Sequence, residues 1–117
     1  MKKLILLFVL LFPLFSCHTK KNINVINYST PLSSNENVEV IGIGQKVMDG
    51  AKLLGSASVG ESGFTPTQKC TYSVVLNEII NIARSMGGNL IQITEHKEPD
   101  GHSTCHRIKA DVYLIKK

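Results

Sequence analysis

The sequence predicts an α+β fold with the element order β-β-α-β-β, in which one helix covers one face of a four-stranded, mainly antiparallel sheet. Apolar residues recur at helical spacing over about 72–86, and alternating apolar and polar residues occur on both sides of that segment. Two turn signals, Asp49-Gly50 and Pro99-Asp100-Gly101, each separate a pair of alternating segments. Two hairpins joined by a helix account for this pattern.

The first hairpin is expected between residues 37 and 60. Residues 37–47 are rich in β-branched side chains, which favours a strand. The Asp49-Gly50 turn signal then returns the chain into a second strand over 51–60. Residues 61–69 contain Gly63 and Pro66 and are expected to form a loop.

The helix is expected to begin after Thr71, a favourable N-cap, and to end before Gly87-Gly88, a strong stop signal. A third strand follows over 89–96. The last strand begins near His106 and alternates strictly. Its core-facing side chains are expected to be Ile108, Ala110, Val112 and Leu114.

The N-terminal residues are typical of an exported protein. Lys2 and Lys3 precede an apolar run over 4–15, which has the length of a signal-peptide hydrophobic region and is too short to span a bilayer. Leu14-Phe15-Ser16-Cys17 is similar to a bacterial lipobox, in which the cysteine is lipidated and becomes the new N-terminus. A thioether diacylglycerol with an N-acyl chain would anchor Cys17 stably. The alternative is an ordinary signal peptide followed by an incidental cysteine.

Three parts are therefore expected along the chain. Residues 1–16 form a lipoprotein signal peptide, and residues 17–37 comprise the lipidated cysteine and a flexible tether rich in Asn, Ser and Thr. A short strand at Ile23–Ile26 is not expected within that tether. Residues 38–117 form a single α+β head, which the tether would lift from the membrane surface.

The charge balance excludes a nucleic-acid footprint. Without Lys2 and Lys3, 11 of the 13 Lys and Arg residues remain against 9 Asp and Glu residues, so the mature chain carries a formal charge of +2. The expected partners are a membrane, reached through the lipid anchor, and another protein of the envelope. His18 follows Cys17 where an Asp would direct retention in the inner membrane by the enterobacterial sorting rule, so the outer membrane is expected.

Cys70 and Cys105 are expected to lie at the same end of the head. Cys70 precedes the helix and Cys105 precedes the last strand, and the intervening helix and strand have matching lengths of about 22 Å and 23 Å. An exported protein would oxidise two thiols placed together. The resulting disulfide would close a loop of about 36 residues and stabilise the fold by roughly 4 kcal/mol.

Two other fates for these cysteines remain open. Cys70, His102, Cys105 and His106 include good zinc ligands, and His96 is expected nearby, although the spacing matches no closed zinc signature. A reactive Cys70 thiolate at the helix N-terminus is the other option. Ser103 beside His102 makes no nucleophile with an oriented base, so the chain is not expected to be an enzyme and no resident cofactor is expected.

Three short stretches resemble the Rcs-phosphorelay sensor lipoprotein and related small lipoprotein domains. They are "LLGSASVGESG" (53–63), "ARSMGGNLIQI" (83–93) and "STCHRIKADVYLI" (103–115). The resemblance implies an α+β head on a lipid anchor that senses envelope damage by changing protein partners. Family heads carry two disulfides; Cys105 matches one family cysteine, whereas Ser62 falls close to the place of another and Cys70 lies elsewhere.

Overall fold

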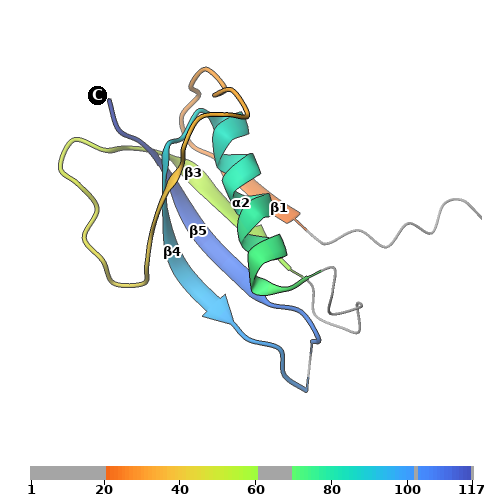
Figure 1. Ribbon diagram of the computed structural model, residues 1–117. Coiled ribbons are helices and arrows are strands. Elements are labelled where there is room, and N and C mark those ends of the chain that lie inside the picture. The colour runs from red at the N-terminus through yellow and green to blue at the C-terminus, as the bar shows by residue number, and fades with distance from the viewer. Residues whose placement is uncertain (1–20, 61–69, 102, 117) are drawn as a thin grey trace, which may run out of the picture.

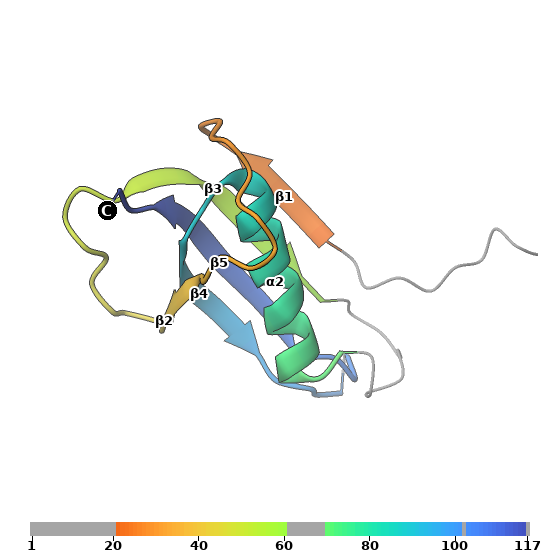
Figure 2. The ribbon, with the colours of Figure 1, turned by 45° about the horizontal axis from the view of Figure 1, so that its top comes forward.

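The computed structural model describes residues 21–60, 70–101 and 103–116. They form a five-stranded mixed sheet with one helix packed on one face (Figures 1 and 2). The strand order across the sheet is β1-β3-β5-β4-β2. The elements are β1 (Lys21–Val25), β2 (Glu39–Ile41), β3 (Lys52–Val59), α2 (Tyr72–Met86), β4 (Leu90–Lys97) and β5 (Arg107–Leu114).

The second half of the fold agrees with the sequence-based prediction. Thr71 caps α2, and its side chain accepts a hydrogen bond from the backbone N–H of Val74. Gly87 ends the helix in a left-handed conformation with φ of 86°, and its N–H donates to the carbonyl of Arg84. Strands β4 and β5 then form the expected antiparallel hairpin.

The expected hairpin across Asp49-Gly50 is wrong. Strand β2 has only three residues and pairs in parallel with β4 at one edge of the sheet, whereas β3 lies between β1 and β5. The strand ends early because the chain turns after Ile41, where Gly44 adopts a positive φ of 79°. Alternating apolar and polar residues indicate a strand but do not show which strand it pairs with. The sequence therefore favoured pairing with the next strand along the chain.

Strand β1 is an addition to the predicted fold. Residues 21–25 pair with β3 in antiparallel register, from Lys21 opposite Val59 to Val25 opposite Gly55. Lys21 Nζ also lies 2.6 Å from Glu78 Oε2 on α2. Strand β1 therefore lies inside the range predicted as a flexible tether.

The connection from β1 to β2 packs against the C-terminal end of α2. The N–H of Leu32 donates to the carbonyl of Arg84 at 2.9 Å, and Arg84 Nε donates to the carbonyl of Glu36 at 2.8 Å. These bonds hold the connection against the last turn of the helix. Residues 26–38 are thus part of the head.

The hydrophobic core lies between α2 and the sheet. The alternation predicted for the last strand is confirmed, since Ile108, Ala110 and Val112 are buried and Leu114 packs against the core. The other buried apolar side chains of this layer are Leu54, Ala57, Val59, Val75, Ile79, Ile82, Ala83, Met86, Ile91 and Ile93. The two cysteines close the same layer at one end.

Gly55 allows β1 to approach β3, so Gly55→Ala should destabilise the head. A Cβ at this position would overlap the carbonyl oxygen of Asn24 in β1 and lie 2.6 Å from Cε of Met86. We expect the free energy of unfolding in urea to fall by about 1–3 kcal/mol. Gly101→Ala is the matched control, because a Cβ there meets nothing within 4 Å. Equal stability of the two variants would contradict this account of β1.

Candidate functional site

The chemistry-bearing residues gather at the end of the head where α2 and β5 begin. Cys70 lies just before the helix cap and Cys105 just before β5, and the two form a disulfide with a Cα–Cα distance of 5.0 Å. Both are about 1% exposed. The N–H of His106 donates to the carbonyl of Cys70 at 3.2 Å, which adds a backbone link beside the covalent one. The predicted convergence and pairing of these cysteines is therefore confirmed.

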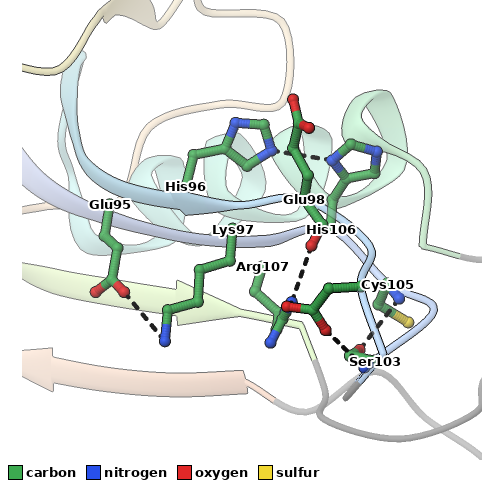
Figure 3. Close-up of polar contacts among 9 residues, drawn as sticks. Glu95, His96, Lys97, Glu98, Ser103, Cys105, His106 and Arg107 are labelled. Atoms are coloured by element: carbon green, nitrogen blue, oxygen red, sulfur yellow. Dashed lines mark hydrogen bonds and ion pairs between the residues drawn. The ribbon is translucent and has the colours of Figure 1, made fainter.

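Ser103 supports the loop before β5. Its side chain is fully buried, and its Oγ accepts a hydrogen bond from the N–H of Cys105 at 3.1 Å (Figure 3). Its own N–H donates to Asp100 Oδ1, and Arg107 Nη2 donates to Asp100 Oδ2 at 3.0 Å and to the carbonyl of Glu98 at 2.9 Å. The sequence suggested two polar loop residues at 102 and 103. Asp100 and Ser103 form a turn in which they bond to each other, and their three-residue spacing in the sequence indicates such a turn.

His96 and His106 form a pair; the sequence placed His96 near His106 but did not predict a direct contact between the two rings. His96 Nε2 lies 2.9 Å from His106 Nδ1, and the two rings stack with their centroids 5.2 Å apart (Figure 3). The ring of Tyr72, the first residue of α2, lies 5.0 Å from that of His96. One of the two ring nitrogens donates in this bond and the other accepts. The pair thus links β4 to the chain entering β5.

Of the residues predicted for zinc, those that the structure describes are not brought together as a ligand set. The sulfurs of Cys70 and Cys105 are bonded to each other, and His106 contacts His96. His102 lies outside the described residues, as does the proposed lipidation site Cys17. Within the ranges that the structure describes, no three His, Cys, Asp or Glu side chains are grouped to hold a metal ion.

The sheet face opposite α2 carries a shallow polar groove, which the sequence analysis missed. Its volume is about 450 Å³, within the usual range for ligand sites. Ser56 lies opposite Asp111 and Ser58 opposite Lys109 across β3 and β5. The side chains and backbone that line the groove come from Asn22, Ile23, Asn24, Ser56, Ala57, Ser58, Thr94, Lys109, Ala110 and Asp111. We call this surface the polar groove.

Ion pairs balance the charge beside the groove. Glu95 Oε1 lies 3.4 Å from Lys97 Nζ, and Glu95 Oε2 lies 3.5 Å from Lys109 Nζ. The hydrogen bond from Lys97, followed by the charge and hydrogen bond of Lys109, lowers the pKa of the Glu95 carboxyl. Partial burial, with a smaller contribution from the charge of Asp111, raises the pKa of Tyr113. The groove and its rim therefore suit a polar ligand of low net charge better than a polyanion.

No family model matches the chain, and neither a curated protein nor a solved structure matches it. Among the described residues, α2 is too short and too polar to cross a membrane. Any function must therefore be argued from the residues themselves.

Reduction should lower the melting temperature of the head, and chelation should not. We expect no titratable thiol at Cys70 or Cys105 in protein denatured with chelator, because both sulfurs are in the disulfide. Opening a loop whose ends are 35 residues apart removes about 4 kcal/mol of stabilisation. The melting temperature should then fall by roughly 15–30 °C, measured by circular dichroism with and without reductant.

A Cys70→Ser, Cys105→Ser double variant serves as the control, since reductant should leave its melting temperature unchanged. Two thiols in the denatured protein, together with stoichiometric zinc in the native protein, would contradict the disulfide and favour the metal site.

Proposed function

We propose that this protein is a lipid-anchored, non-enzymatic component of the bacterial outer membrane, whose small disulfide-stapled head binds another envelope component. The observation that carries the proposal is Leu14-Phe15-Ser16-Cys17, placed directly after a short apolar run and two lysines. The disulfide between Cys70 and Cys105 supports export to an oxidising compartment. The resemblance to the Rcs-phosphorelay sensor lipoprotein favours a role in sensing envelope stress.

A binding role fits the chemistry of the described residues better than catalysis. Ser103 is buried, and its hydroxyl supports the N–H of Cys105. The histidine pair links β4 to the chain entering β5, and its bonded nitrogens are directed at each other. These groups have evident structural uses, and neither forms a nucleophile with an oriented base.

The polar groove is the surface we assign to the partner. Its side chains are short amides, hydroxyls and one Lys and Asp each, all of which can form hydrogen bonds. Because these side chains are short, a partner could approach the sheet closely. The partner expected from this chemistry presents polar, nearly uncharged groups.

Replacing Cys17 should abolish lipidation. The Cys17→Ala protein should lose all labelling by a fatty-acid analogue and accumulate with its signal peptide uncleaved. The measurement is metabolic labelling followed by gel mobility and mass spectrometry. Cys70→Ser is the matched control, because loss of a different cysteine should leave the label in place. A wild-type protein that never takes up the label would refute the lipid anchor.

A large side chain in the groove should weaken partner capture. Ser56→Arg fills the groove and can pair with Asp111 on the neighbouring strand, so the fold should tolerate it. We expect at least a several-fold loss of the cross-linked partner recovered from intact envelopes. Asn77→Arg, on the exposed side of α2, is the control and should capture normally. Undiminished capture by a folded Ser56→Arg protein would place the binding surface elsewhere.

A further inference from the structure

We propose that the disulfide end of the head faces the membrane and that strand β1 holds it in this orientation. The inference rests on the proposed lipidation of Cys17 and deepens it, because it assigns one end of the head to the lipid surface. The observation behind it is the short sequence distance between Cys17 and the start of β1.

The covalent distance from the anchor to the sheet is short. Only residues 18–20 separate Cys17 from Lys21, the first residue of β1. Four Cα steps of at most about 3.6 Å span roughly 14 Å. Lys21 must therefore stay within that distance of a lipidated Cys17 for as long as β1 remains in the sheet.

The strand register shows at which end of the head Lys21 lies. Lys21 lies opposite Val59, Val59 lies opposite Ile108, and Ile108 lies opposite His96. These residues mark the end of the sheet that carries the disulfide and the start of α2. In Figure 2 the start of β1 lies on the side away from the C-terminus.

When the disulfide end faces the membrane, the opposite end of the sheet lies well beyond the reach of the anchor. Lys52 at the start of β3 lies opposite Leu114 at the end of β5. Seven strand steps separate Lys52 from Val59, which is about 23 Å. This distal end also carries Lys116 and the turn in which the N–H of Ala51 donates to the carbonyl of Met48.

Among the described residues, charges at the membrane-facing end are largely paired. Lys21 pairs with Glu78, Lys97 with Glu95, and Arg107 with Asp100. A balanced surface gains little from anionic headgroups, whereas a basic cluster would attract them. The orientation should therefore come from the short covalent connection and be insensitive to salt.

The test uses single tryptophans, because the chain contains none. Glu98 is exposed beyond the end of β4, at the membrane-facing end, and Lys116 is exposed at the distal end. Glu98→Trp and Lys116→Trp are made separately in the full-length lipidated protein. Each is reconstituted into phosphatidylcholine vesicles that contain a headgroup nitroxide quencher.

We expect several-fold stronger quenching for Glu98→Trp than for Lys116→Trp, at both low and high salt. A Gly/Ser spacer of roughly 12 residues, inserted between Lys20 and Lys21, adds about 20 Å of reach. Quenching of Glu98→Trp should then fall to the level of Lys116→Trp.

Mass spectrometry of the same samples separates the two hypotheses. If Cys17 carries lipid and the two tryptophans are quenched equally, or the distal one more strongly, the orientation is refuted and the proposed anchor stands. If Cys17 carries no lipid, both the proposed function and this inference are refuted.

Discussion

The disulfide between Cys70 and Cys105 is the constraint on which the rest of the head depends. It joins the chain entering α2 to the chain entering β5, the strand at the centre of the sheet. The helix is thereby fixed at one end above the strand that it must cover. A core this small buries limited apolar area, so a covalent link contributes a large share of the net stability. The Ser103 turn and the histidine pair are built around the same junction.

Local sequence signals were sufficient to predict the second half of the fold. The cap at Thr71, the stop at Gly87 and the strict alternation of β5 each depend on neighbouring residues, so the sequence alone located α2 and the β4–β5 hairpin. The cysteine pairing followed from the lengths of the elements between them. The first half depends on contacts between distant residues. Strand β1 pairs with a strand some 30 residues away, and β2 pairs with β4 across the helix.

The same distinction explains what was missed in the candidate site. The polar groove consists of alternate residues on strands that are not neighbours in the sequence, so it appears only once their order is known. The contact between His96 and His106 depends on the register of β4 with β5. Ser103 was predicted only as a polar loop residue, because the burial of its hydroxyl depends on the turn around it.

The position of β1 has a mechanical consequence. Its ladder bonds to β3 run across the strand direction. Tension applied at Lys21 along the strand would load these bonds together in shear, so β1 would resist a gradual pull and yield abruptly. After release of β1, the chain between Cys17 and Ile26 could extend to roughly 30 Å, while residues 26–38 would stay bonded to α2 and β3. If Cys17 is anchored as proposed, a strand whose five residues are all exposed would release the head from the membrane only above a threshold force.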